Sequence, residues 1–429
     1  MKLFHIFFIL AVVSMVILSL NQAISQEVIT INGIVADSAS GKGLPFAQIA
    51  IQNSTIGTVT NEDGCFKLDI PVLFALDSIL VMYMGYETLR EAVSDLEGKP
   101  ARLVLKAGTL KLAEVEILSI SAEEVIKRVV ANIPANYGKD SLVLTAFIRS
   151  QKFVNGKMAE FTEAIIEDLK TGYNLYQDKE HKVRKSRSNI PFLLKGRVTS
   201  DTTLLNSVGE IGVNAGCLGC NFVNDFVEFY HNTVLDERFF QYYTFKLEEL
   251  FTSGGGKIYH IWFDQKHGVK KTLWKGEMFI NGYDFALLKI TQRPSYEAFD
   301  QFEKRKFKRP YTILNTPGWY QEMPMMEWTT TYSLRNGKYF LNTIRIQNWL
   351  TFINPANGRK LKFAHKNEVV VTDASRDAVK IHNFRGDKSI GATQRWDQIV
   401  GTTDDLFWLK FNYLPIEEKL KKELQQISR

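Results

Sequence analysis

The sequence predicts a mainly β protein in which a small sandwich precedes a larger antiparallel domain. Between residues 31 and 105, short strand-like runs alternate with turn residues roughly every 8–12 positions, which is typical of an all-β sandwich. Farther along the chain, four Asn-Gly pairs lie between strand-like runs, and each favours a hairpin. A chain of 429 residues is also too long for one ordinary core, so more than one domain is expected.

The first 25 residues are predicted to be a secretory signal peptide. Lys2 precedes an apolar run that ends near Leu20, and the small residues Ala23 and Ser25 stand at the −3 and −1 positions of a cleavage site. The alternative is an uncleaved membrane anchor, because the run is nearly long enough to span a bilayer. No cysteine lies near the cleavage point, so we do not expect a lipoprotein.

The first folded domain is predicted at residues 28–107 as a seven-stranded Greek-key sandwich. The segment from Asn61 to Gly64 predicts a tight hairpin. Ser78–Met84 is a nearly continuous apolar run, which indicates a central strand buried on both faces. Cys65 alternates with apolar residues and is therefore expected to face outward as an unpaired thiol. The strands are expected at residues 29–36, 46–52, 66–70, 78–84 and 102–106.

The residues of this first domain resemble a known family. In order, they carry Gly33-x-Val35-x-Asp37, Leu44-Pro45-Phe46-Ala47, Gly57-Thr58, Asn61-x-x-Gly64-x-Phe66 and Gly85-Tyr86. This pattern is similar to the carboxypeptidase-regulatory-like domain, a transthyretin-like β-sandwich common at the front of exported Bacteroidetes proteins. The resemblance implies an accessory module without a peptidase site. Together with the signal peptide, it implies a periplasmic or outer-membrane-associated protein.

Residues 108–120 are predicted to be a linker, and residues 121–429 a β-rich domain with a few helices. Its long antiparallel strands suggest one curved sheet or an open barrel. The Asn-Gly pairs at 155, 281, 336 and 357 are expected to turn hairpins. The strands are predicted at residues 143–153, 157–169, 257–263, 329–334, 338–352 and 360–372, with a further hairpin over 276–290.

Three helices are predicted in this second domain. Ser121 to Glu124 is a capping box, and the apolar stripe that follows it is expected to cover one end of the sheet. A second helix is expected around residues 224–231. A third is expected at 415–428 as an exposed helix, with Glu417 among its surface residues. The segments Thr145–Arg149 and Phe407–Leu414 are similar to the region after the sandwich in large Bacteroidetes envelope proteins of unknown function.

The sequence carries no recognised catalytic motif. It lacks a G-x-S-x-G elbow, a P-loop, a dinucleotide glycine fingerprint and H-E-x-x-H. His365 and Glu368 match the H-x-x-E of zinc peptidases, but three positions apart on a strand they would point to opposite faces. Glu160, Glu163 and Glu167 are expected to line a solvated face without a marked partner. We therefore expect no catalytic residue, metal or cofactor.

Two other groups of residues are candidate sites. Lys304, Arg305, Lys306, Lys308 and Arg309 are interleaved with aromatic residues, a pattern that can bind single-stranded nucleic acid. An exported protein rarely meets nucleic acid, so an anionic lipid or glycan surface is the favoured functional interpretation, and a solvated loop is the alternative. Cys217 and Cys220 form a C-x-x-C among glycines, which favours a local disulfide or plain thiols over metal or redox chemistry.

The expected function is therefore that of a non-enzymatic cell-envelope protein. It would bind an envelope protein, lipid or glycan across sheet edges or a concave face, with peripheral contact to the outer membrane and no nucleic acid. One alternative is an exported hydrolase, which would show a deep pocket with converging His or carboxylates of perturbed pKa. Another is a carrier of an apolar ligand, which would show a lipid-sized apolar cavity in its curved sheet.

Overall fold

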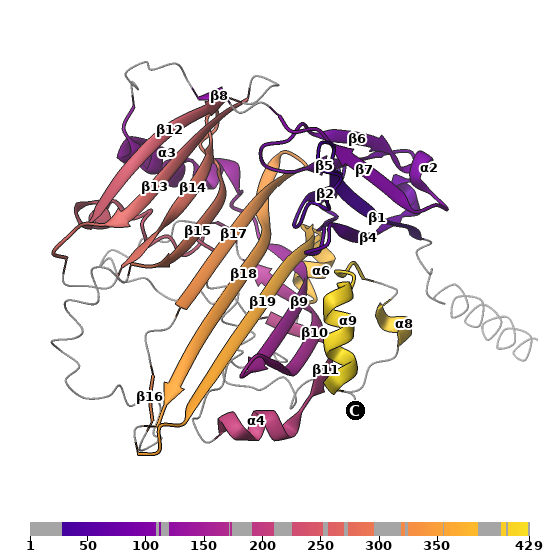
Figure 1. Ribbon diagram of the computed structural model, residues 1–429. Coiled ribbons are helices and arrows are strands. Elements are labelled where there is room, and N and C mark those ends of the chain that lie inside the picture. Colours follow the sequence, from indigo (N-terminus) through magenta and orange to yellow (C-terminus); the bar gives the residue numbers. More distant parts are fainter. Residues whose placement is uncertain are drawn as a thin grey trace, which may run out of the picture.

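The computed structural model places a small β-sandwich against a large curved sheet (Figure 1). The signal peptide at 1–25, the pair Cys217 and Cys220, and the basic cluster at 304–309 lie outside the described residues and stay predictions. Within the described part of the chain, no helix is long and apolar enough to cross a membrane. The structure describes residues 28–108, 111–112, 120–170, 172–173, 191–209, 225–251, 256–269, 273–295, 319–321, 325–354, 356–384, 405–408 and 411–427.

Seven strands form the N-terminal sandwich, as the sequence predicts. They are β1 (Val28–Asp37), β2 (Gln48–Ile51), β3 (Gly57–Val59), β4 (Cys65–Pro71), β5 (Ser78–Met82), β6 (Leu89–Ala92) and β7 (Ala101–Leu105). One sheet has the order β4-β1-β7 and the other β3-β2-β5-β6. Alternate apolar residues such as Ile31, Ile49 and Val81 are fully buried between the two sheets and form the core.

Two local predictions for the sandwich are wrong. Asn61 does reverse the chain, because its Oδ1 accepts hydrogen bonds from the backbone N–H groups of Asp63 and Cys65, at 3.0 and 2.8 Å. However, β3 pairs with β2 and β4 with β1, so this turn carries the chain between sheets and closes no hairpin. β5 is an inner strand, but only Ile79 and Val81 are buried, because its other face is half-covered.

The residues after the sandwich build one open, curved antiparallel sheet of 12 strands, which confirms the predicted β-rich architecture. The strands are β8 (Lys111–Leu112), β9 (Leu142–Val154), β10 (Lys157–Lys170), β11 (Pro191–Ser200), β12 (Tyr243–Phe251), β13 (Lys257–Gln265), β14 (Trp274–Asn281), β15 (Leu287–Pro294), β16 (Tyr320–Gln321), β17 (Met325–Arg335), β18 (Lys338–Ile353) and β19 (Lys360–Ser375). The order is β11-β10-β9-β19-β18-β17-β15-β14-β13-β12-β8, with β16 beside β18. The end strands β11 and β8 do not pair with each other, so the sheet is open.

The four Asn-Gly pairs turn the chain in two different ways. Asn155-Gly156 and Asn336-Gly337 have positive φ at both residues and connect their strands directly, as a type I′ turn requires. Asn281 instead begins a longer loop, in which its Oδ1 accepts the backbone N–H of Tyr283 at 2.9 Å and Phe285 adopts a φ of 59°. At Asn357-Gly358 only the glycine has positive φ, within a loop between β18 and β19.

The helices agree in part with the prediction. They are η1 (Val72–Phe74), α2 (Val93–Leu96), α3 (Ala122–Asn136), α4 (Thr202–Gly209), η3 (Glu237–Tyr242), α6 (Ala378–His382), α8 (Asp405–Trp408) and α9 (Glu418–Ile427). Helix α3 begins as predicted, with Ser121 Oγ accepting the N–H of Glu124 at 3.2 Å. The helix predicted around 224–231 is wrong, since residues 225–231 contain turns and no helix. Strands β11 and β12 were not predicted, and β8 lies within the predicted linker.

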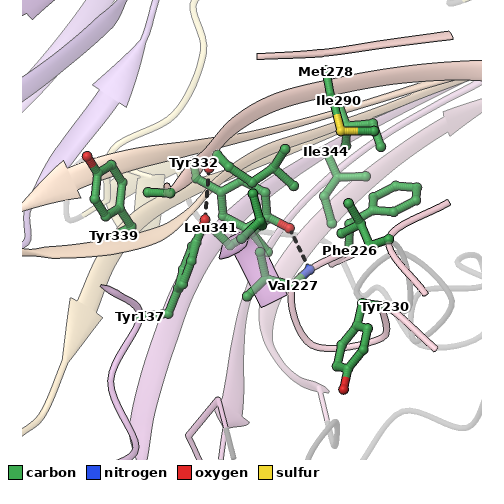
Figure 2. Packing of buried hydrophobic residues seen from close by; sticks show 14 of the residues in the cluster. Tyr137, Phe226, Val227, Tyr230, Met278, Ile290, Tyr332, Tyr339, Leu341 and Ile344 are labelled. Carbon is green, nitrogen blue, oxygen red and sulfur yellow. Dashed lines mark hydrogen bonds between the residues drawn. The ribbon is translucent and has the colours of Figure 1, made fainter. Parts of the chain in front are cut away.

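The inner, concave face of the sheet is filled by its own core. Helix α3 and residues 226–242 pack into the curve of the sheet (Figure 1), and Figure 2 shows the aromatic part of this packing. The hydroxyl of Tyr137 donates to the carbonyl of Leu287 at 2.8 Å, and the hydroxyl of Tyr332 accepts the backbone N–H of Val227 at 3.1 Å. This face therefore presents buried side chains where the sequence analysis allowed a concave binding surface.

The sandwich is fixed against the outer face of the sheet by polar contacts. Arg335 is buried at the end of β17 and donates to the carbonyl of Thr55 at 2.9 Å and to the Asn342 side chain at 2.6 Å. The hydroxyl of Thr55 donates to Asp373 at 2.8 Å. Burial lowers the pKa of Arg335 to about 10, which still leaves the guanidinium charged at neutral pH. The two domains thus share a buried, hydrogen-bonded joint.

Candidate functional site

One row of side chains crosses the outer face of the sheet from strand to strand. In the strand register each member lies directly opposite the next, which places their Cβ atoms about 4.5–5.5 Å apart. In sheet order from β12 to β11, the row is Lys246, Trp262, Glu277, Thr291, Thr329, Arg345, Glu368, Arg149, Glu163 and Arg197. One half of this row is buried, and the other half is open.

The buried half centres on Arg149, whose side chain is fully buried. Its Nε and Nη2 donate to Glu163 Oε1 at 2.9 and 2.7 Å, and its Nη1 donates to Glu417 at 3.1 and 3.2 Å. Nη2 also donates to the carbonyl of Leu414 at 2.6 Å. Burial alone would lower the pKa of Arg149, but Glu163 and Glu417 outweigh it and hold the pKa above its usual value. The C-terminal segment is therefore anchored to the sheet by charge.

Two sequence predictions are wrong at this anchor. Glu163 lies on no solvated face: it is fully buried and pairs with Arg149 and Arg197. Glu160 and Glu167 also have partners, in Lys152 at 2.6 Å and Lys380 at 2.8 Å. Glu417 is buried too, because α9 packs its apolar side, including Leu420, on Met158 and Phe161. From the sequence alone, the position of Glu163 on its strand looks solvent-exposed. The segment that covers it lies about 250 residues later in the chain, so no local pattern reveals the cover.

Arg345 links the buried half to the sandwich. Its guanidinium carbon lies 3.6 Å from the ring centroid of Phe46, and its Nε lies 3.6 Å from Glu368 Oε1. Burial raises the pKa of Glu368, although Arg345 and Arg149 both act against that rise. Because Phe46 belongs to the sandwich, this cation–π contact connects the row of side chains on the sheet to the sandwich.

The open half of the row lines a groove with a volume of about 640 Å³. The groove crosses β12, β13, β14, β15 and β17, a width of roughly 19 Å at the usual strand spacing. Its lining combines one indole with hydroxyl and charged groups. The lining residues are Thr244, Phe245, Lys246, Trp262, Phe263, Asp264, Lys275, Gly276, Glu277, Thr291, Gln292, Arg293 and Glu327.

Trp262 is held in this groove by an aromatic stack. The His260 ring lies 3.6 Å from the Trp262 ring centroid and stacks on Phe279 at 4.0 Å. His260 Nε2 also lies 2.9 Å from Glu277 Oε2, which fixes the orientation of the imidazole. The Lys246 ammonium lies 5.0 Å from the Trp262 ring centroid, and its side chain is 71% exposed. The indole is thus packed on one side, while the Lys246 ammonium on its ring is largely exposed and pairs with Glu248 at 2.8 Å.

Two of the three carboxylates that line the groove, Glu277 and Asp264, have partners within the protein, whereas Glu327 is exposed and makes no ion pair or hydrogen bond within the described residues. The hydrogen bond from His260 lowers the pKa of Glu277, and Lys289 acts in the same direction. Asp264 Oδ1 accepts the hydroxyl of Ser295 at 2.7 Å. Arg293, by contrast, is exposed and makes no ion pair or hydrogen bond within the described part of the chain. Within the groove, the guanidinium of Arg293 and the carboxylate of Glu327 are therefore both accessible to a ligand, whereas Glu277 and Asp264 are engaged.

A second, smaller groove of about 440 Å³ lies beside α9. Trp349, which is 40% exposed, faces Phe153 across the small residue Ala364. The charged groups at its margin are mostly paired, since Lys366 lies 3.7 Å from Glu62. This groove offers a matched tryptophan for comparison with Trp262.

Another group of charges lies in the core and lines neither groove. Lys170 is buried, and its ammonium donates to Asp225 and, at 2.7 Å, to Glu228. Asp225 Oδ1 accepts the hydroxyl of Tyr332 at 2.7 Å. Asp168 lies two residues before Lys170, is fully buried, and has no hydrogen-bond partner for either carboxylate oxygen within the described structure. Burial raises the pKa of Asp168 to about 8, against the attraction of Lys170.

Ser150 and His365 form a buried pair on the inner face. His365 Nε2 lies 2.9 Å from Ser150 Oγ, and the two residues are 7% and 1% exposed, respectively. Burial, with Lys152 adding to it, lowers the pKa of His365 to about 3, so the imidazole is neutral. Neither residue lines either groove, and a nucleophile must be reached by its substrate. Across the described ranges, no group of His, Cys, Asp and Glu is arranged to hold a metal ion.

We predict that Arg149→Ala lowers the free energy of unfolding by about 3–5 kcal/mol, because Glu417 would lose its cationic partner and buried Glu163 would keep only Arg197. Urea titration of the full chain measures this. Arg128→Ala is the control: Arg128 pairs with Glu124 on a half-exposed helix face, and its loss should cost at most about 0.5 kcal/mol. Equal small losses in both variants would contradict the anchor.

Stability should also depend on pH through Asp168. In the unfolded chain this carboxyl titrates near 3.9, so between that pH and about 8 the folded state keeps a proton that the unfolded state has lost. The contribution of Asp168 to stability should therefore fall as pH rises through this window, by up to about 1.4 kcal/mol per pH unit, whereas neutral His365 acts in the opposite direction below about pH 6.5. Asp168→Asn should flatten the dependence in urea titrations at pH 5 and pH 8. An identical slope in both proteins would refute the assignment.

The comparison with known proteins bears on the sandwich. The family model of the CarboxypepD_reg-like domain matches residues 31–117, from within β1 to beyond β8. The match therefore runs past the predicted domain end at residue 107. None of the curated proteins matches the chain. Residues 31–117 of this protein thus form a CarboxypepD_reg-like domain, the non-catalytic β-sandwich module that the sequence indicates.

Proposed function

We propose that this protein is a non-enzymatic binding protein of the cell envelope, and that the 640 Å³ groove on the outer face of the large sheet is its binding surface. The single observation that carries the proposal is the division of one cross-strand row into two halves. Its buried half, around Arg149, fixes the sandwich and the C-terminal segment. Its open half, around Trp262, leaves an ordered aromatic and polar groove without a covering element among the described residues.

The geometry favours this function over the two alternatives. A carrier needs an apolar cavity, but the concave face is filled by α3 and by the packed residues around Tyr137, Tyr332 and Tyr339, which Figure 2 shows. A hydrolase needs its perturbed groups at an accessible surface, but Asp168 and His365 are buried and line neither groove. The groove on the sheet face is therefore better suited to binding a ligand than to carrying an apolar molecule or catalysing a reaction.

The location in the envelope rests on the sequence. The segment at 1–25 has the charge, apolar run and small residues of a signal peptide, and the CarboxypepD_reg-like domain is an accessory module. The protein would then act in the periplasm or at the outer membrane, with the basic cluster at 304–309 making peripheral contact with an anionic surface. The partner would be an envelope protein, lipid or glycan.

Affinity capture from a native envelope fraction tests the proposal. The wild-type chain should enrich an envelope component, identified as protein, lipid or saccharide, and Trp262→Ala and Arg293→Ala should each reduce its recovery at least tenfold. Trp349→Ala, in the second groove, should leave the recovery unchanged. Recovery of cytoplasmic proteins alone, or equal recovery by the Trp262 and Arg293 variants, would overturn the proposal.

A further inference from the structure

We infer that the outer-face groove binds an extended glycan chain that bears carboxylates. This inference deepens the proposed function and rests on it, because it names the ligand of the same groove. Three features point to this chemistry: the packed indole of Trp262, the hydroxyl-bearing side chains beside it, and two accessible cations on either side of it.

The indole suits a sugar ring. Trp262 is half-buried, and its ring packs at a tilt of 40° against His260, which itself stacks on Phe279. A pyranose presents an apolar face of C–H groups that packs on a flat aromatic surface, while its hydroxyls point sideways. Thr244 and Thr291 also lie in the groove: Thr244 Oγ1 donates to the carbonyl of Asp264 at 3.2 Å, and Thr291 Oγ1 shares a hydrogen bond with Thr329 Oγ1 at 3.1 Å. Each oxygen can still accept a hydrogen bond from a sugar hydroxyl.

The cations suit carboxylates on that chain. Arg293 is free of partners within the described residues, and its planar guanidinium matches a carboxylate with two parallel hydrogen bonds. Lys246 rests over the Trp262 ring and forms an exposed ion pair with Glu248 at 2.8 Å. Exposed cation–π contacts and surface ion pairs are worth roughly 1 kcal/mol or less. An arriving anion can therefore draw this ammonium off the indole and expose the ring to a sugar.

The spacing calls for an oligomer rather than a single sugar. Trp262 on β13 and Arg293 on β15 are two strand spacings apart. Thr291 lies in the same row as Trp262, so Arg293 is also two residues farther along its strand. Strand spacing places their Cα atoms about 12 Å apart. One sugar ring cannot contact both, whereas a chain with a carboxylate on each unit can reach Lys246, Trp262 and Arg293 together.

Peptide and lipid ligands fit the groove less well. A peptide that binds by strand addition needs an unpaired sheet edge, but the groove is centred on β13, β14 and β15, which each pair on both sides. An acyl chain needs an aliphatic channel, but the apolar lining residues Trp262, Phe245 and Phe263 are aromatic, and most of the other lining residues carry hydroxyl or charged groups. A glycan uses the face of a sheet, which is what the groove offers.

Isothermal titration of the full chain with polygalacturonate fragments tests this inference. The wild-type protein should bind, and affinity should fall with added salt because the charges are exposed. Trp262→Ala and Arg293→Ala should each weaken binding at least tenfold. Trp349→Ala and Arg102→Ala, which remove an exposed tryptophan and an exposed arginine outside the groove, should change it less than twofold. Monomeric galacturonate should bind at least tenfold more weakly than the fragments.

Three control ligands make the test decisive. Equal affinity for neutral dextran would overturn the role of the carboxylates, and equal binding of dextran sulfate by wild type and Trp262→Ala would reveal charge attraction alone. Binding to anionic lipid vesicles without binding to polygalacturonate would overturn the glycan in favour of a lipid surface. If capture from the envelope depends on Trp262 while polygalacturonate fails to bind, the proposed ligand class is wrong, but the groove is still the binding surface. If both fail, the proposed function fails as well.

Discussion

The pairing of Arg149 with Glu163 and Glu417 is the interaction on which the arrangement of this protein depends. A guanidinium that is fully removed from water needs partners for its charge and its donors, and Arg149 finds them on β10 and in the C-terminal segment. Replacing such a network with apolar residues need not weaken a protein, so its contribution lies chiefly in specificity. A register slip of one residue would turn Arg149 toward the apolar inner face, where Leu144 and Ile148 lie. The charged row therefore selects one register of the sheet.

The need of buried charges for partners also explains why one half of the row on the outer face is covered and the other is open. Where Arg345, Glu368, Arg149 and Glu163 face one another, only a covering element with matching charge can dock, and the C-terminal segment brings Glu417. Where Lys246, Trp262, Glu277 and Thr291 continue the row, the groups find partners along the sheet itself, as His260 does with Glu277. The open half therefore needs no covering element to satisfy its charged groups.

Much of the fold could be predicted from the sequence because its determinants are local. Asn155-Gly156 and Asn336-Gly337 determine their turns through positive φ, and Ser121 determines the start of α3 through one hydrogen bond.

The candidate site could not be predicted, because the residues that form it are distant from one another in the sequence. Glu163 looks solvated until Glu417 and Leu414 are placed over it, and Trp262 has no marker that distinguishes it from Trp349. Strand β11 was missed because Gly196 and Lys195 interrupt its apolar pattern.

Two residues of the motif by which the sandwich resembles its family also contact the rest of the protein. Phe46 lies in the motif that resembles the regulatory-like domain, and its ring receives Arg345. Asn61, from the same pattern, shapes a turn with its Oδ1 and donates through Nδ2 to the carbonyl of Pro415 at 3.1 Å. Pro415 also accepts from Arg149, so the sandwich turn, the C-terminal segment and the buried charge meet at one carbonyl. The module is therefore a structural part of the outer face of the sheet, because it contributes both a turn and an aromatic ring to the cover over the buried half of the row.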